Sequence, residues 1–128
     1  MTKLFIIDDD PINNFLSKKS IEKSGPDTHI STFTNPVQAI NTLNEQPYDP
    51  TIVLLLDLNM PEMSGWDVIE TLRHPYKVYI LTSSISAVDK AKCGKYSNIS
   101  GFISKPLTPQ TGELVIKKTN LFDHLRAV

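Results

Sequence analysis

Four aspartates lie where strongly apolar runs end, and their side chains suggest a chemistry. Asp8, Asp9 and Asp10 follow one such run, and Asp57 follows another. Carboxylates held close together repel one another, so they stay ionised together only where a cation compensates their charge. Mg²⁺ prefers such oxygen ligands, whereas zinc is disfavoured because no His or Cys lies beside these acids. The pattern predicts a Mg²⁺ site.

Two further polar residues also end apolar runs, and both suit phosphoryl chemistry. Thr82 follows the run Val78–Leu81, and Lys105 comes shortly after Gly101–Ile103. An aspartate can itself attack phosphorus and form an acyl phosphate. A hydroxyl, an ammonium group and a metal ion can then neutralise the phosphoryl oxygens. Asp57 is the best candidate nucleophile, because its strand would be central in the sheet.

These residues converge only if the apolar runs form one parallel sheet. Five short apolar runs alternate with longer stretches that carry helix-start signals, and the third and fourth runs are apolar throughout, as in strands covered on both faces. This pattern predicts an α/β fold with a doubly wound, five-stranded parallel sheet and five helices, in the flavodoxin-like strand order 2-1-3-4-5. The five runs are Leu4–Ile7, Thr28–Phe33, Ile52–Leu56, Val78–Leu81 and Gly101–Ile103.

The helices are predicted from capping residues and from apolar spacing. A capping residue precedes proline at Asp10, Asn35 and Thr108, which favours helix starts there, and helix capping is the better interpretation of Asp10. Gly112 suggests a delayed start of the last helix, at Thr111 or later. The expected core stripes are Val37, Ile40 and Leu43; Trp66, Ile69 and Leu72; and Leu114, Leu121, Phe122 and Leu125.

Length, charge and cysteine content argue against several classes of protein. The 128 residues fit one domain, residues 1–128, with no output domain. A net charge of −1 argues against direct nucleic-acid binding, and no apolar run approaches the length that spans a membrane. One cysteine and no signal-peptide pattern favour a cytoplasmic location.

Four motifs occur in an order that resembles a known family. They are the acidic pair Asp8-Asp9, the stretch Asp57-Leu-Asn-Met-Pro-Glu-Met-Ser-Gly65, Leu81-Thr82-Ser83 and Ser104-Lys105-Pro106. Together they resemble the receiver domain of a two-component response regulator, along essentially the whole chain. The resemblance implies a signalling phosphoacceptor rather than a turnover enzyme. Its expected partner is a sensor histidine kinase or a histidine phosphotransfer protein.

The resemblance also implies roles for individual residues. Asp57 would accept the phosphoryl group from a phosphohistidine. Asp8, Asp9, Asp57 and the backbone carbonyl of Asn59 would hold Mg²⁺, with Asp9 the more direct ligand of the acidic pair.

The remaining roles concern contacts to the phosphoryl oxygens and the conformational change that phosphorylation would cause. Thr82 and Lys105 would contact the phosphoryl oxygens, and a cis peptide is expected at Pro106. Phe102 would be the switch aromatic, which reports phosphorylation to the face formed by the fourth helix, fifth strand and fifth helix. A plain core position is the alternative for Phe102.

A different class of protein remains as an alternative. Asp8, Asp9 and Asp10 also fit the first motif of haloacid dehalogenase-like phosphatases, in which a first-strand aspartate is the nucleophile. That class needs an acidic motif after the lysine, and only Glu113 and Asp123 follow Lys105.

One feature near the predicted rim departs from the family pattern, and another affects how long a phosphoryl group would survive. The 25-residue interval from Asp57 to Thr82 is short for the family and predicts a brief third helix that stops near His74. The small polar residues Asn59 and Ser84 predict a short-lived acyl phosphate.

Overall fold

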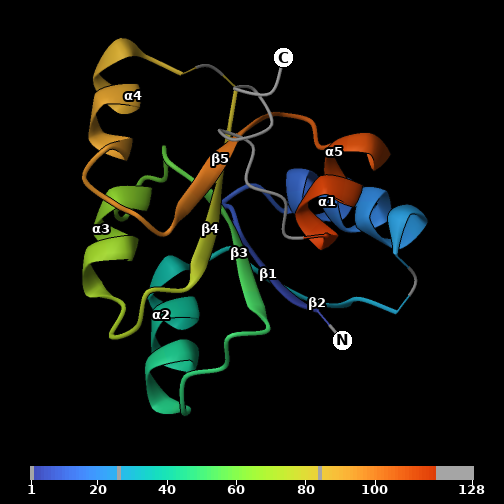
Figure 1. Cartoon of the computed structure of the whole chain (residues 1–128), viewed down its shortest axis with the longest axis horizontal. Coiled ribbons are helices and arrows are strands. Elements are labelled where there is room, and N and C mark those ends of the chain that lie inside the picture. The colour runs from blue at the N-terminus through green and yellow to red at the C-terminus, as the bar shows by residue number, and fades with distance from the viewer. Residues whose placement is uncertain (1, 26, 84, 118–128) are drawn as a thin grey trace.

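A computed structural model describes residues 2–25, 27–83 and 85–117, which form a five-stranded parallel sheet (Figure 1). The strand order is β2-β1-β3-β4-β5, as the sequence predicts for a doubly wound, flavodoxin-like fold. The strands are β1 (Lys3–Ile7), β2 (His29–Phe33), β3 (Ile52–Asp57), β4 (Lys77–Thr82) and β5 (Ile99–Ser104).

Five helices cover the two faces of the sheet. Figure 1 shows α1 and α5 on one side and α2, α3 and α4 on the other. Their bounds are α1 (Pro11–Ser24), α2 (Pro36–Glu45), α3 (Gly65–Thr71), α4 (Ala87–Cys93) and α5 (Pro109–Ile116). The third helix is brief, as predicted from the short interval before Thr82.

The core has two halves because β3 is apolar on both of its faces. Leu54 and Leu56 belong to the half under α2, α3 and α4, whereas Val53 and Leu55 pack with residues of α1 and α5. All six residues of β3 are buried. A strand buried on both faces must be central, and this places Asp57, its last residue, in the middle of one rim of the sheet.

Strand register aligns the polar residues at that rim. Ile7 pairs with Leu56, so Asp8 lies beside Asp57. Asp57 pairs with Leu81, and Thr82 pairs with Ser104. The ends of β4 and β5 therefore lie at the same edge of the sheet as Asp57. Parallel strands that end together therefore bring Asp8, Asp57, Thr82 and Lys105 to one edge.

The last helix begins where the capping residue Thr108 predicts, and earlier than Gly112 suggests. Its first residue is Pro109, and Thr108 caps it by accepting a hydrogen bond from the backbone N–H of Thr111. The expectation that Gly112 delays the start to Thr111 or later is wrong, because Gly112 lies inside the helix, against α1. A Cβ at Gly112 would come within 3.2 Å of both Ile21 Cδ1 and Ser24 Oγ, so the absence of a side chain permits close packing of the two helices.

Two of the predicted core stripes need correction. Ile40 and Leu43 are buried as predicted, but Val37 is 46% exposed, and α2 buries Pro36 and Ala39 as well. Val115 is the fully buried apolar residue of α5, whereas Leu114 is half-buried. Leu121, Phe122 and Leu125 lie outside the described residues.

Helix α1 has the reverse of the usual polarity. It buries Asn14, Ser17 and Ile21, while Ile12 and Phe15 are 67% and 58% exposed. Hydrogen bonds from Ser20 Oγ to Leu107 O and from Ser24 Oγ to Pro109 O tie α1 to the segment that leads into α5. Small polar residues thus mediate the contact between these helices, and apolar residues are left on the outer face.

Among the described helices, none has the length and apolar character needed to cross a bilayer.

Candidate functional site

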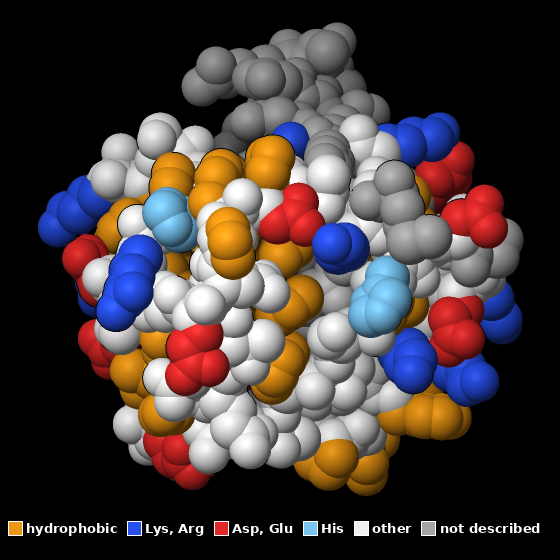
Figure 2. Space-filling view, turned by 90° about the horizontal axis from the view of Figure 1, so that it is seen from below, with side chains coloured by type: hydrophobic (Ala, Val, Ile, Leu, Met, Phe, Trp, Pro, Cys, Tyr) orange, Lys and Arg blue, Asp and Glu red, His pale blue; other side chains and the backbone are white. Residues whose placement is uncertain are grey.

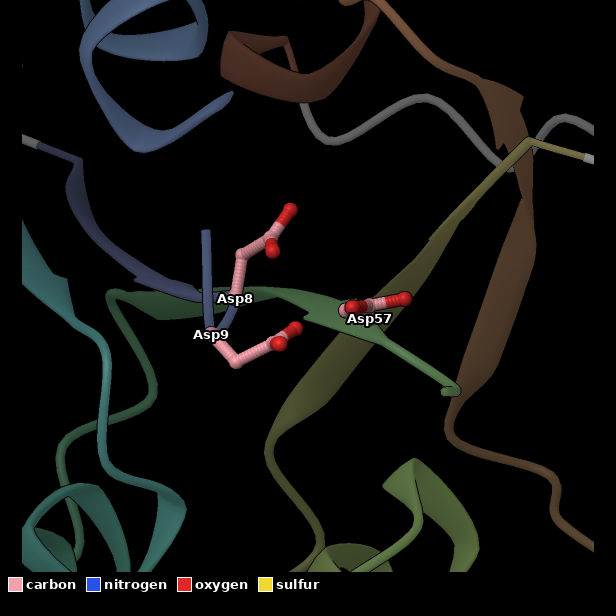
Figure 3. Close-up of side chains that lie close together, drawn as sticks. All are labelled: Asp8, Asp9 and Asp57. Carbon is pink, nitrogen blue, oxygen red and sulfur yellow. The ribbon is translucent and has the colours of Figure 1, made fainter. Parts of the chain in front are cut away.

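Three aspartates converge at the rim, as the sequence predicts. Each of Asp8, Asp9 and Asp57 offers a carboxylate oxygen, and these oxygens all lie within 4.8 Å of one another. Figure 3 shows the side chain of Asp9 pointing from the loop after β1 toward Asp57 at the end of β3, with Asp8 beside them and its carboxylate directed upward in this view. Asp8 and Asp57 are 0% and 4% exposed, whereas Asp9 is exposed to solvent.

A lysine from the end of β5 compensates part of this negative charge. Lys105 Nζ lies 2.8 Å from Asp8 Oδ2 and 3.4 Å from Asp57 Oδ2. Burial lowers the pKa of Lys105, but the hydrogen bonds and charges of Asp8 and Asp57 outweigh burial and raise the pKa above its ordinary value. The ammonium therefore stays charged and acts as a fixed cation between the two buried carboxylates.

Asp57 is harder to ionise than an ordinary aspartate. Burial raises its pKa from 3.8 to about 6, and the charge of Asp8 adds to the increase. The Asn59 backbone N–H and Lys105 oppose that increase but do not cancel it. A carboxylate in this position is stabilised by any additional cation at the rim.

Backbone groups orient two of the acids. The N–H of Asp10 donates to Asp8 Oδ1 at 3.0 Å, and the N–H of Asn59 donates to Asp57 Oδ1 at 3.2 Å. Asp10 itself caps α1 by accepting from the N–H of Ile12 at 2.9 Å, which confirms the capping interpretation. Asp10 is thus engaged at the helix start, while Asp8 and Asp9 belong to the acidic cluster with Asp57.

The donor set fits a hard divalent cation. The converging groups are carboxylates, and the described residues that form this cluster include no His or Cys. Asp8 Oδ2 is buried and lies 2.8 Å from Lys105 Nζ, a pairing that leaves a lone pair of this oxygen available. Oxygen donors with unused lone pairs suit Mg²⁺ better than zinc.

The other predicted site residues take the following positions. Thr82 is buried at the end of β4, and its backbone carbonyl accepts from the N–H of Lys105 at 2.9 Å. The peptide between Lys105 and Pro106 is cis, as expected. Asn59 is exposed in the loop after β3, and Ser84 lies outside the described residues.

Phe102 lies on β5 and packs, partly buried, against the core half that α2, α3 and α4 cover. Phe102 therefore lies on the side of the sheet that carries α4.

A hollow at the other end of the sheet is separate from this chemistry. A pocket of about 560 Å³ is lined by Lys3, His29 and Ile52, which begin β1, β2 and β3, and by the loop before β3. Figure 2 looks at the molecule from below, and hydrophobic side chains gather on this face among scattered charged ones. The acidic cluster therefore lies at the opposite rim from this pocket.

Sequence reasoning missed two residues that support the site. Asn14 is buried on α1 and contacts the backbone of Asp8. Gly65 begins α3, and its N–H donates to Leu58 O at 3.0 Å. The absence of an apolar stripe in α1 is a signal for Asn14, whereas the close approach at Gly65 is visible only in three dimensions.

Substituting Gly65 with alanine should destabilise the protein by about 1–3 kcal/mol. An added Cβ would lie 2.6 Å from the backbone oxygen of Asp57 and 3.1 Å from Leu58 Cα, and backbone atoms cannot move aside as a flexible side chain can. Urea unfolding followed by circular dichroism measures the effect. Gly94→Ala is the matched control, because its Cβ would meet Ala91 O at an ordinary 3.5 Å. Equal unfolding midpoints for the two variants would contradict the prediction.

The sequence of this chain matches the family model of the response regulator receiver domain over residues 4–117. The chain therefore belongs to the receiver domain family, and it is a phosphoacceptor domain of two-component signal transduction.

Two curated relatives are a sensor protein and a hybrid histidine kinase. Sensor protein EvgS of Escherichia coli (strain K12) is 31% identical over 121 residues, and hybrid signal transduction histidine kinase C of Dictyostelium discoideum is 27% identical over 128 residues. The matches cover 92% and 91% of this chain but 9% and 10% of those proteins. The chain thus spans about a tenth of the length of these relatives.

Solved structures share the whole architecture. A two-component response regulator from Cytophaga hutchinsonii is 29% identical, with a TM-score of 0.77 over 92% of this chain and 96% of that one. Another from Legionella pneumophila is 24% identical and supports the fold, with a TM-score of 0.75 over 100% of both chains. The family match replaces the phosphatase alternative, in which a first-strand aspartate would be the nucleophile.

Proposed function

We propose that Asp57 is the phosphoacceptor and that Asp8, Asp9 and Asp57, with the backbone carbonyl of Asn59, hold a Mg²⁺ ion. The observation that carries the proposal is the convergence of three carboxylates within 4.8 Å, with Lys105 between the two buried ones. Bound Mg²⁺ would supply the additional positive charge that keeps the acids ionised and offsets the charge of the phosphoryl group.

The reaction is a transfer between two proteins. A carboxylate oxygen of Asp57 attacks the phosphorus of a phosphohistidine. An O–P bond forms as the P–N bond breaks, and the electron pair of that bond stays on the imidazole nitrogen. Lys105 is already charged and close to Asp57, so it can pair with a phosphoryl oxygen without a large rearrangement. Thr82, at the end of the neighbouring strand, donates its hydroxyl to another.

The phosphoryl donor is a sensor histidine kinase or a histidine phosphotransfer protein. The similarity to a sensor protein and to a hybrid histidine kinase supports this choice. The apolar outer face of α1 offers such a partner a surface beside the rim, because α1 starts directly after the acidic loop. Ile12, Phe15 and Leu16 are its exposed residues, and Lys19 Nζ lies over the Phe15 ring at 5.5 Å.

Phosphorylation is read out through Thr82 and Phe102. A phosphoryl group adds about two negative charges and three strong acceptors, which draw the Thr82 hydroxyl inward. Phe102 then turns into the space that opens, and the face of α4, β5 and α5 changes for a partner protein. The partly buried position of Phe102 supports this role, because a fully packed ring would have no second position.

The experiment measures phosphoryl uptake by intact mass. The chain is incubated with phosphoramidate, with and without Mg²⁺. Wild type should gain the mass of one phosphoryl group only with Mg²⁺, and Asp57→Asn should gain none. Asp27→Asn, which alters an exposed aspartate away from the rim, is the control and should behave as wild type. Uptake by Asp57→Asn, or uptake by wild type after Mg²⁺ is chelated, would refute the proposal.

A further inference from the structure

Asn14 is a buried polar residue whose hydrogen bonds are only half satisfied. Its side chain is on the inner face of α1, and the residue is 4% exposed. The amide Nδ2 donates to Asp8 O at 2.9 Å and reaches Phe33 O at 3.4 Å. Its Oδ1 has no partner among the described residues. A buried acceptor without a partner lowers stability. This cost suggests that the hydrogen bonds donated by Nδ2 have a role that an apolar side chain could not fill.

The two bonds of Nδ2 meet the chain where the acidic pair begins. Asp8 O and Phe33 O lie at the ends of neighbouring strands, β1 and β2, and the N–H of Asp8 also donates to Phe33 O at 3.1 Å. The carbonyl of Asp8 belongs to the rigid peptide plane that leads into Asp9. Holding that carbonyl therefore sets the direction in which the Asp9 side chain leaves the backbone.

Asp9 depends on such support more than Asp8 does. Asp8 is buried, accepts the N–H of Asp10 and lies against Lys105. Asp9 is exposed, and no hydrogen bond or ion pair of its side chain is recorded among the described residues. The orientation of its carboxylate toward Asp57 thus rests on the backbone that precedes it.

We propose that Asn14 is a positioning residue for the Asp8-Asp9 pair, and this inference rests on the proposed Mg²⁺ site. By fixing the peptide between the two acids, the Asn14 amide holds Asp9 in the place from which it binds the metal. Groups that orient metal ligands in this way contribute strongly to metal affinity although they do not touch the ion. An apolar side chain of similar size would remove the unpaired acceptor but would leave the peptide free to turn.

The test separates metal affinity from stability in the full chain. Mg²⁺ binding is measured by isothermal titration calorimetry, and stability by the urea midpoint without Mg²⁺. In Asn14→Leu, the Kd for Mg²⁺ should rise about tenfold, while the urea midpoint should change only modestly, because the lost bond to Asp8 O is offset by removal of the unpaired Oδ1. Asn14→Ala repeats the measurement with a side chain too small to clash, in case leucine disturbs the packing.

Ser17→Ala is the matched control, because Ser17 lies one turn further along the same buried face of α1. It should leave the Kd for Mg²⁺ unchanged. An unchanged Kd in both Asn14 variants, or a Kd that rises equally in Ser17→Ala, would overturn the positioning role while the Mg²⁺ site stands. Wild type that binds no Mg²⁺ would overturn the site and the positioning role together.

Discussion

Replacing Lys105 with methionine should lower the free energy of unfolding by about 3 kcal/mol at neutral pH without Mg²⁺. The Lys105 ammonium lies 2.8 Å from Asp8 Oδ2 and 3.4 Å from Asp57 Oδ2, and both acids are almost fully buried. Methionine keeps the apolar stem but removes the charge, so two buried carboxylates face one another without this cation. Leaving a buried charge uncompensated is one of the most destabilising effects of a single substitution.

Urea unfolding of wild type and Lys105→Met, each with and without Mg²⁺, measures this loss. Mg²⁺ should restore much of the stability of the variant, because the ion supplies positive charge to the same carboxylates. Lys3→Met is the control: Lys3 pairs with Asp49 at 2.9 Å, but both side chains are partly open to solvent, so the loss of this pair should have a smaller effect. A loss in Lys105→Met that is no larger than in Lys3→Met would show that the rim lysine does not compensate buried charge.

Replacing Asp57 with asparagine should stabilise the metal-free protein at neutral pH by up to about 3 kcal/mol, and should have little effect in acid. The pKa of Asp57 rises from 3.8 to about 6 on folding, mainly through burial. Below the lower pKa value, the carboxyl is protonated in both the folded and the unfolded state, so its burial carries no cost of ionisation. Between the two values the unfolded chain loses the proton and the folded chain keeps it, so stability falls as the pH rises. Above the higher pKa value, the folded state bears the full free-energy cost of a buried, ionised carboxylate.

Asparagine is close to aspartic acid in shape and has no charge, so the variant should escape that penalty. The free energy of unfolding of wild type and Asp57→Asn is compared across this pH range without Mg²⁺. The two curves should meet in acid and separate as the pH rises through the pKa of Asp57. Saturating Mg²⁺ should narrow the gap, because the ion stabilises the ionised carboxylate of the wild type. A separation that is the same in acid and at neutral pH would mean that burial of the charge is not its cause.

The rim could be predicted because its residues are set by local sequence. β3 is apolar at every position until Asp57, and Asp8 directly follows β1. In a parallel sheet, strands that end in polar residues bring those residues to one edge whatever the details of packing. Helix starts at Asp10, Asn35 and Thr108 were predictable for the same reason, because a capping bond joins residues two or three positions apart.

Burial on the helices was harder to predict, because it depends on which partner each helix meets. Val37 has the spacing of a core residue, but α2 turns Ala39 and Leu43 toward the sheet and leaves Val37 in solvent. Gly112 is unfavourable inside an isolated helix. It is accepted in α5 because α1 packs too closely there to admit a side chain.

The amino-acid sequence alone therefore determined the family, the order of the strands and the acids that meet at the rim, since each depends on a motif or on where a strand ends. Only the tertiary structure decided what holds those acids in place. The sequence predicts Lys105 at the same rim, but only the structure shows that its ammonium pairs with both buried carboxylates. Asn14 and Gly65 support the site through backbone atoms of Asp8, Phe33 and Asp57, and contacts to backbone leave no pattern in the side chains they touch.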